Sequence, residues 1–357
     1  MVRSLLENVY DEIHWIDPTI TRLPRWSDVA RSTQAEEKHA AEPLLPQLHV
    51  LRPGGLPIEP IPLFNRVNDW FVWHKIKANI ASLDIDLSWD IGIGRPSRLA
   101  LWAVENLQSR ISFMDVMDDF PAFYSGLSRY SMERTEDTLA GRCDYLFCSE
   151  ETLIRKLAKY SPRVSIKLVS NGYDMQRLPA FSTARSQKEV IGFIGTIATW
   201  FDWRLVIEMA NALPQLRVKL IGPRAGYIPS HLPSNIELLP ACTVEDAIRH
   251  CQNFTVGLIP FLNNQLTRSV DPIKYYELRA LGIPVWSTAF GSMVNRLNEP
   301  GVAQIYSGID WKKLWEESSN VSADPIEIAR FRQNNDWTVR FEKMPEYLNV
   351  SRKIIKT

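Results

Sequence analysis

A short segment in the second half of the sequence places a lysine and a glutamate on one face of a well-marked helix. The segment reads SVDPIKYYELRALGIPVWST. Asp271 can cap the helix, Pro272 fits its first position, and Gly282 fits the left-handed position that ends it. Lys274 and Glu277, spaced i and i+3, then lie near the positive end of the helix dipole, which favours anions. A phosphate held by Lys274 and a ribose diol held by Glu277 suit this geometry. A solvated Lys–Glu pair is the alternative.

Three acids gather at the end of a predicted strand in the first half. Asp115, Asp118 and Asp119 lie in the sequence FMDVMDDFPAF. A carboxylate within hydrogen-bond reach of a hydroxyl can take its proton, so this cluster is a candidate for a general base. The alternative is that Asp118 or Asp119 caps the helical turn that follows.

Other motifs that could carry chemistry are weak or absent from the sequence. None of the six histidines lies in HExxH or in a recognisable triad. The segment GIGRP lacks the third glycine of a nicotinamide fingerprint, and there is no GxxxxGK[ST] phosphate loop. The four cysteines are too irregularly spaced for a disulfide framework or a CxxC metal site, which predicts reduced, mostly buried thiols. We therefore predict no metal site and no cofactor.

Composition narrows the class of protein. The chain has 357 residues, of which 45% are hydrophobic, so disorder is excluded as the dominant state. Acids and bases balance at 41 each, and this balance argues against a nucleic-acid partner. No apolar run approaches the roughly 20 residues that cross a bilayer, and the opening residues carry acids where a signal peptide is basic and then apolar. These features predict a cytoplasmic protein, with a peripheral position at the inner membrane surface left open.

The first half of the sequence alternates predicted strands and helices. A Pro-rich stretch, LRPGGLPIEPIPLF, is too dense in proline for a helix, and a helical pattern follows over 70–83. The predicted strands are IDLSWDIGIG, RISFMDVMDD, CDYLFCSE and VSIKLVSNGYD. The predicted helices are SRLALWAVENL, residues 132–140 and EETLIRKLAKY. This alternation implies a parallel sheet with crossover helices.

The same alternation restarts after a polar segment, PAFSTARSQKE, which we interpret as a linker. The strands predicted beyond it are VIGFIGT, RVKLIGP, NIELLP, FTVGLIPF and IPVWST, and the helices are WRLVIEMANAL, TVEDAIRHC and PIKYYELRALG. We therefore predict an α/β protein of two tandem domains, 1–180 and 181–357. Ligands of such sheets bind beyond the carboxyl ends of the strands, so function is expected in the strand-to-helix loops.

The segment around Lys274 closely resembles the donor-binding helix of bacterial glycosyltransferases with the GT-B fold, of the family 1/4 type. The residues that match, in order, are Asp271-Pro272, Lys274, Tyr276-Glu277, Leu281-Gly282 and Pro284-Val285. The segments FIGTIATWFDWRLV, LIGP, GLIPF and VSNGYD agree with the same family. The sequence is similar to transferases of teichuronic-acid and exopolysaccharide biosynthesis and, more distantly, to xanthan glucuronosyltransferases.

This resemblance implies two Rossmann-like domains whose parallel sheets face a cleft. The N-terminal domain, 1–180, would lie on the acceptor side, and the C-terminal domain, 181–357, would bind the nucleotide-sugar donor and end in helices. The resemblance assigns the donor diphosphate to Lys274 and the ribose to Glu277. Enzymes of this fold generally need no bound metal, because cationic side chains and amides stabilise the leaving diphosphate.

Several further residues of the C-terminal domain acquire roles from the resemblance. Gly192 and Gly195, with Thr196, would let backbone amides approach the diphosphate closely. Arg204 is a further candidate for binding this charge, although it could simply begin a surface helix. The aromatic run WFDW at 200–203 could stack on a sugar or base, or pack at the start of a helix.

The resemblance also bears on the acceptor side and on stereochemistry. An acid of the Asp115, Asp118 and Asp119 cluster would activate the acceptor hydroxyl, as an inverting transferase requires. Retaining enzymes of this type carry a glutamate eight residues before the one at Glu277, and Ser269 stands there instead. Family members open with a strand and a Gly-rich loop that we do not find. The resemblance thus leaves two alternatives, a truncated start or a remodelled N-terminal domain, and in both the domain would lack its first strand.

These observations together predict a glycosyltransferase of polysaccharide biosynthesis. It would move a sugar from a UDP- or GDP-linked donor to a saccharide or lipid-linked acceptor. One alternative is a non-catalytic protein, derived from a GT-B enzyme, that binds a nucleotide-sugar or a glycan. Another is a sugar-nucleotide epimerase, whose expected acid and histidine sites are not evident.

Overall fold

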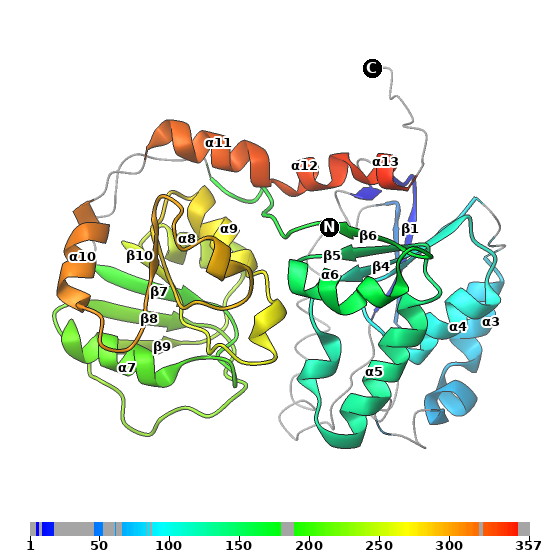
Figure 1. Ribbon diagram of the computed structural model, residues 1–357, viewed down its shortest axis with the longest axis horizontal. Helices are drawn as coiled ribbons and strands as arrows, with labels where there is room; N and C mark the ends of the chain where they lie inside the picture. Colours follow the sequence, from blue (N-terminus) through cyan, green and yellow to red (C-terminus); the bar gives the residue numbers. More distant parts are fainter. Residues whose placement is uncertain are drawn as a thin grey trace. The chain divides into compact units, whose positions relative to one another are not determined.

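Two units make up the chain in the computed structural model (Figure 1). The structure describes residues 5–6, 9–17, 46–52, 61, 66–83, 85, 88–179, 189–320 and 324–348. Unit 1 comprises Met1–Ser149, Leu153–Leu168 and Lys343–Thr357, whereas unit 2 comprises Glu150–Thr152 and Val169–Glu342. The predicted linker spans 179–189; its residues 180–188, and with them the predicted boundary near residue 180, lie outside the described residues.

A four-stranded parallel sheet forms the centre of unit 1, in the order β3-β4-β5-β6. Its strands are β3 (Asp90–Ile93), β4 (Ile111–Val116), β5 (Tyr145–Cys148) and β6 (Ser165–Leu168). The helical elements between them are α4 (Arg98–Asn106), η2 (Phe120–Phe123), α5 (Gly126–Ala140), α6 (Glu151–Leu157) and η3 (Ala158–Tyr160). Helix α5 begins at Gly126, directly after the extended Ser125, and therefore before the predicted residue 132. The prediction missed its first turns because their residues are polar or exposed and give no apolar periodicity.

The chain before this sheet adds a second, smaller sheet to unit 1. Strands β1 (Ile13–Ile16) and β2 (Leu48–Leu51) pair in parallel with each other. The π-helical turn η1 (Asn68–Val72) and helix α3 (His74–Ala81) follow, and Trp73 and Ile76 pack there with Leu99 of α4. In the described residues, the strands that precede β3 thus form a pair of their own and do not join the four-stranded sheet.

Unit 2 is built on a six-stranded parallel sheet in the order β12-β11-β10-β7-β8-β9. The strands are β7 (Val190–Ile194), β8 (Arg217–Ile221), β9 (Ile236–Leu239), β10 (Val256–Ile259), β11 (Val285–Ser287) and β12 (Val302–Gln304). The helical elements are α7 (Trp203–Ala212), α8 (Val244–Cys251), η4 (Thr267–Ser269), α9 (Ile273–Ala280), η5 (Gly291–Asn295), α10 (Trp311–Asn320), α11 (Pro325–Asn335) and α12 (Trp337–Glu342). The strand order is that of a doubly wound nucleotide-binding fold.

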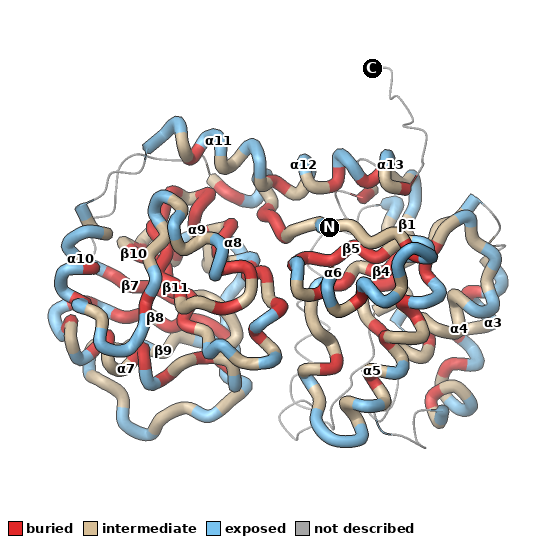
Figure 2. The backbone as a smooth tube through the Cα atoms, in the orientation of Figure 1, coloured by how far each residue is buried: buried red, intermediate tan, exposed pale blue. Residues whose placement is uncertain are grey.

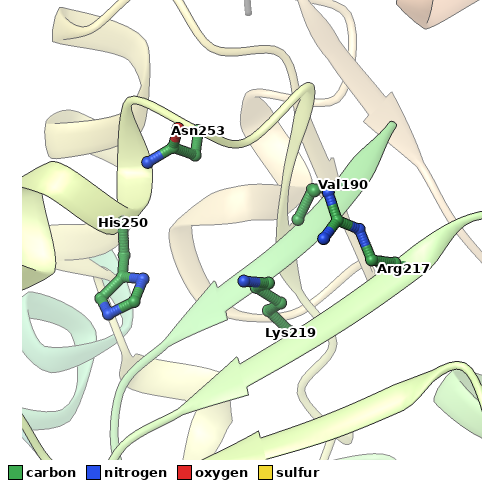
Figure 3. Close-up of a pocket in the computed structure, with 5 residues that line it drawn as sticks. All are labelled: Val190, Arg217, Lys219, His250 and Asn253. Carbon is green, nitrogen blue, oxygen red and sulfur yellow. The ribbon is translucent and has the colours of Figure 1, made fainter. Parts of the chain in front are cut away.

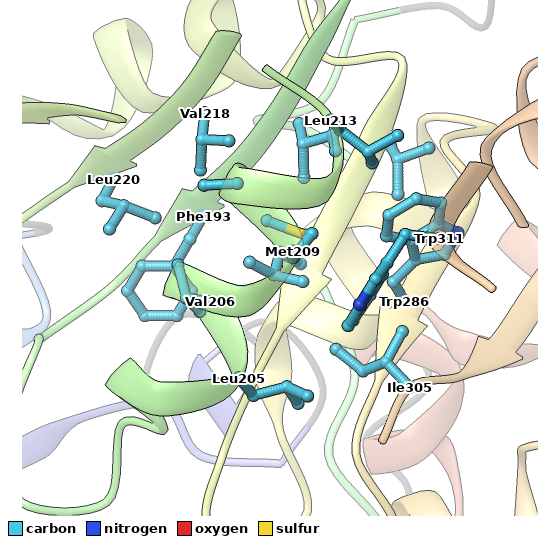
Figure 4. Packing of buried hydrophobic residues seen from close by; sticks show 14 of the residues in the cluster. Phe193, Leu205, Val206, Met209, Leu213, Val218, Leu220, Trp286, Ile305 and Trp311 are labelled. Atoms are coloured by element: carbon cyan, nitrogen blue, oxygen red, sulfur yellow. The ribbon is translucent and has the colours of Figure 1, made fainter. Parts of the chain in front are cut away.

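Large apolar side chains explain why this sheet is stable. Phe193 of β7, Met209 of α7 and Trp286 of β11 are almost completely buried in one cluster, in which the rings of Trp286 and Trp311 lie 6.0 Å apart (Figure 4). Burial of each such side chain contributes about 1.5–3 kcal/mol. The central strands β7, β10 and β11 are almost entirely buried, as parallel strands covered by helices on both faces must be (Figure 2).

The last described helix, α13 (Met344–Tyr347), belongs to unit 1. Its Tyr347 ring contacts Phe147 of β5, with ring centroids 6.3 Å apart. Among the described residues, no helix has the length and apolar character needed to span a membrane.

Candidate functional site

The topology of the unit 2 sheet identifies where a ligand would bind. Strands β8 and β9 lie on one side of β7, and β10, β11 and β12 lie on the other. In doubly wound sheets, ligands bind beyond the carboxyl ends of the strands where the winding reverses, which here is between β7 and β10. The loop after β7 begins at Gly195, and α9 is the helix that follows β10. Gly195, Thr196 and the start of α9 therefore border the same end of the sheet.

Glycine is required where the loops after β7 and β8 meet. Gly222 has a φ of +143°, and a Cβ there would lie 2.1 Å from the carbonyl oxygen of Gly195. The Gly195 amide donates to the last carbonyl of β8 at 2.9 Å. Among the described residues, the Thr196 amide has no such acceptor. Gly192 serves packing instead, because a Cβ there would overlap the Phe254 ring.

A buried carboxylate fixes the start of α9. Asp271 accepts hydrogen bonds from the Asn171 amide at 2.8 Å, the Tyr276 hydroxyl at 2.9 Å and the Ser292 hydroxyl at 2.7 Å. It also forms an ion pair with Arg296 at 2.7 Å. Burial and the nearby Asp271 charge raise the pKa of Tyr276, so its hydroxyl stays protonated and donates. This network holds the first turn of α9 from several directions.

The predicted capping role of Asp271 is wrong. The N-cap residue of α9 is Pro272, and no side chain caps this end. The Asp271 carboxylate cannot cap because its oxygens are occupied by the partners described above. The prediction for the other end is confirmed, since Gly282 has a φ of +74° immediately after the last turn. The helix boundaries are therefore set by a tertiary network at one end and by a local glycine at the other.

Lys274 and Glu277 contact each other on the first turns of α9. The Lys274 Nζ lies 2.5 Å from the Glu277 Oε2, and the two side chains are 36% and 29% exposed. The pair is therefore accessible to a ligand from solvent, and neither group is locked in the core. An exposed ion pair of this kind is worth only about 0.3–0.5 kcal/mol, so a ligand with stronger partners could separate it at little cost.

Arg204 lies on the first turn of α7, with an exposed side chain. The hydrogen bond from the Gly308 amide is the largest cause that lowers the pKa of the nearby Glu208 carboxyl, and the charge of Arg204 makes a smaller contribution. The Glu208 carboxylate accepts this amide at 2.7 Å and the Ser307 hydroxyl at 2.6 Å. Arg204 is thus placed at the ligand-facing end of the sheet, with a surface interaction of its own.

The aromatic run at 200–203 is part of the core. Phe201 is 3% exposed and Trp203 is 9% exposed, and their rings lie 4.8 Å apart. The Trp203 Nε1 donates to the Tyr227 carbonyl at 2.9 Å. These contacts favour packing at the start of α7 over stacking on a sugar or base.

A cavity of about 240 Å³ lies at the opposite end of the same sheet. It is lined by Val190, Arg217, Lys219, His250 and Asn253 (Figure 3). Val190 and Arg217 are the first residues of β7 and β8, so the cavity opens at their amino ends. None of the residues predicted to bind a ligand lines it.

The acids of unit 1 differ sharply in their surroundings. Asp115 lies in β4, and burial, followed by the charge of Asp118, raises its pKa to about 7. Burial, followed by the charge of Asp119, raises the pKa of Asp118 to about 6. Among the described residues, no side chain forms a hydrogen bond or an ion pair with the Asp118 carboxylate. A partly buried carboxylate with a pKa near 6 is well suited to accept a proton near neutral pH.

Asp119 is held by a lysine that the sequence did not single out. Its carboxylate contacts the Lys156 Nζ at 2.7 Å, and it makes no side-chain capping bond to η2. Lys156 also donates to Glu136, a residue of α5 with no exposed surface. Burial raises the pKa of Glu136 to about 7, whereas Lys156 acts to lower it. Lys156 thus neutralises two acids from different elements.

We expect Lys156→Met to lower the free energy of unfolding of unit 1 by about 3 kcal/mol, because it leaves Glu136 buried without its cation. Burial raises the pKa of Glu136 in the folded state, and without Lys156 the pKa should rise further. Ionised Glu136 then destabilises the folded variant, so the loss of unfolding free energy in Lys156→Met should grow as pH rises from 5 to 8. Urea unfolding at both pH values measures this. Lys159→Met, which breaks the exposed pair with Asp137, is the control and should cost at most about 1 kcal/mol. Equal losses in the two variants would contradict the prediction.

Known proteins support the fold that the sequence predicted. No protein-family model matches the chain. It is 24% identical over 324 residues to the putative teichuronic acid biosynthesis glycosyltransferase TuaH of Bacillus subtilis, with 81% of this chain and 80% of that protein covered.

Two solved structures extend the similarity over nearly the whole chain. Sucrose-phosphate synthase from Thermosynechococcus elongatus superposes with a TM-score of 0.63 at 12% identity, covering 95% of this chain and 98% of that one. Anabaena HepE, solved with UDP and glucose, superposes with a TM-score of 0.62 at 13% identity, covering 95% of this chain and all of that one. The protein therefore has the fold of the GT-B glycosyltransferases, as its sequence predicted.

Proposed function

We propose that the protein is a glycosyltransferase of polysaccharide biosynthesis. It would move a sugar from a UDP- or GDP-linked donor to a saccharide or lipid-linked acceptor. The observation that carries this proposal is the position of Lys274 and Glu277 on the helix that follows β10, where the winding of the sheet reverses. The similarity to TuaH supports a role in polysaccharide biosynthesis, and the structure of HepE with UDP-glucose supports a nucleotide-sugar as the donor.

In the proposed donor complex, the ligand replaces the contact between Lys274 and Glu277. The ammonium of Lys274 would bind the diphosphate, and the carboxylate of Glu277 would accept hydrogen bonds from the ribose hydroxyls. The Thr196 amide, presented by the tight turn at Gly195, would donate to the diphosphate. Arg204 would add positive charge at the same end of the sheet.

The proposed reaction needs one base and one stabilised leaving group. The acceptor hydroxyl oxygen attacks the anomeric carbon, the bond from that carbon to the diphosphate breaks, and the hydroxyl proton passes to Asp118. The leaving nucleoside diphosphate keeps the bonding electrons, and Lys274 with nearby amides stabilises its charge. In this scheme the donor site requires no metal and no cofactor besides the nucleotide-sugar.

We further propose that the protein acts in the cytoplasm, where nucleotide-sugars are used, and that it associates with the inner membrane surface when its acceptor is lipid-linked. Fractionation of cells that produce the protein tests this location. Recovery outside the cytoplasmic and membrane-peripheral fractions would contradict it.

Calorimetric titration with UDP, GDP and their sugars tests the donor site. We expect Lys274→Ala and Glu277→Ala each to weaken binding of the preferred nucleotide-sugar by roughly tenfold or more, because each removes a charge-assisted hydrogen bond. The matched control is Lys313→Ala, which breaks an exposed Lys–Glu pair on α10 and should bind the donor like the unaltered protein. Unchanged affinity in both α9 variants would overturn the assignment. Release of the nucleoside diphosphate over time distinguishes an enzyme from a binding protein.

A further inference from the structure

Two histidines and a glutamate converge on the small sheet of unit 1, and none of the three has a role in the proposed reaction. His14 of β1 and His49 of β2 are directly opposite each other in the parallel register. Glu12 immediately precedes β1. The candidate ligand atoms of these three residues all lie within 4.8 Å of one another.

The geometry of the three side chains is convergent. The Glu12 Oε1 lies 2.9 Å from the His14 Nε2 and 3.0 Å from the His49 Nε2. The two imidazole rings stack with centroids 4.7 Å apart, and the edge of Trp89 contacts the His14 ring at 5.2 Å. The side chains of His49 and Glu12 are each 49% exposed, whereas His14 is 16% exposed. The cluster therefore has one anchored side and one side that a solute can reach.

We propose that Glu12, His14 and His49 form a three-ligand site for a divalent transition-metal ion, with Zn²⁺ as the preferred occupant. Two imidazole nitrogens and one carboxylate oxygen are a ligand set that Zn²⁺ takes in proteins. Ligand atoms about 2.0–2.1 Å from a tetrahedral Zn²⁺ lie roughly 3.3 Å apart, so the separations of 2.9 and 3.0 Å need only a small expansion. Water would complete the coordination.

The site would join two strands that are far apart in the sequence. A two-stranded sheet is marginally stable by itself, and β1 and β2 have four residues each. An ion bound to both strands cross-links two segments that are distant in the sequence and stabilises their pairing. β1 is already anchored, because the Tyr10 hydroxyl donates to Asp90 of β3 at 3.0 Å. The ligands are thus placed before the ion binds.

A bound ion would replace the contacts that the two Nε2 atoms make with the Glu12 carboxylate. Mg²⁺ and Ca²⁺, which prefer oxygen ligands, should not compete.

The test uses the full chain after treatment with a chelator. Titration with Zn²⁺ is expected to fill one site, and Co²⁺ should give the absorption bands of a site with nitrogen and oxygen ligands. Glu12→Gln and His49→Gln should each weaken Zn²⁺ binding by at least about tenfold and abolish the Co²⁺ bands. The exposed residue His74 provides the matched control, because His74→Gln removes an imidazole outside the cluster.

Thermal unfolding in the same samples provides a second measurement. Zn²⁺ should raise the Tm of the unaltered protein and of His74→Gln, but not that of Glu12→Gln. Either of two results would overturn the proposal. One is the absence of stoichiometric Zn²⁺ binding to the unaltered protein. The other is equal affinity in Glu12→Gln, His49→Gln and the control.

Discussion

Asp118→Asn is expected to lower the turnover of a nucleotide-sugar donor by about 10²–10⁴-fold, because it removes the proposed general base while preserving its shape. The raised pKa of about 6 also predicts a pH profile. A base must be ionised to act, so kcat/KM should fall about tenfold per pH unit below 6 and level off above it. Release of UDP from UDP-glucose, followed from pH 4.5 to 8, measures both effects.

The matched control is Asp137→Asn, which neutralises an exposed acid of α5 that pairs with Lys159. It should retain full turnover and the same pH profile. Donor affinity should be unchanged in Asp118→Asn, because the proposed donor contacts all come from unit 2. If Asp118→Asn keeps full turnover, the base is a different residue. Asp115→Asn then becomes the next variant to test, since its pKa is raised to about 7.

Asp271→Ala is expected to lower the free energy of unfolding of unit 2 by about 3–5 kcal/mol, the typical cost of leaving one partner of a buried ion pair uncompensated. Its carboxylate has no exposed surface, and Arg296 would keep its charge at a position that is 13% exposed. The Asn171 amide and the Tyr276 and Ser292 hydroxyls would lose their acceptor as well. Donor affinity should fall too, because this network holds the turn that carries Lys274.

Urea unfolding followed by tryptophan fluorescence measures this loss, with the transition of unit 2 fitted separately from that of unit 1. Asp246→Ala is the matched control, since it breaks an exposed pair with Arg249 on α8. We expect the control to cost about 1 kcal/mol, chiefly because Asp246 also contacts the capping residue Thr243. Unfolding of Asp271→Ala at the same urea concentration as the control would mean that the network is not stabilising.

Local sequence patterns were enough to predict most of the fold. β7 and β10 are short apolar runs followed directly by glycine or proline, and buried parallel strands have this pattern. Gly282 marked the end of α9 because helices often end at a left-handed position, which glycine adopts easily. Lys274 and Glu277 could be paired from sequence because i and i+3 residues always share a helix face.

Interactions between distant segments could not be predicted in this way. Asp271 looked like a helix cap, because the partner that occupies its carboxylate, Asn171, lies 100 positions away. Glu136 lies within the helix predicted over 132–140, and only the folded unit brings Lys156 to it. His14 and His49 showed no metal-ligand spacing, since the pairing of β1 with β2 is what aligns them.

The position of the donor is tested most directly by hydrogen–deuterium exchange of the full chain with and without saturating UDP. Binding at the carboxyl end of the unit 2 sheet predicts slower exchange in peptides covering 195–202 and 270–278. Exchange around Arg217 and His250, at the amino-end cavity, should be unchanged. Protection at the cavity, with 195–202 and 270–278 unaffected, would contradict the proposed site.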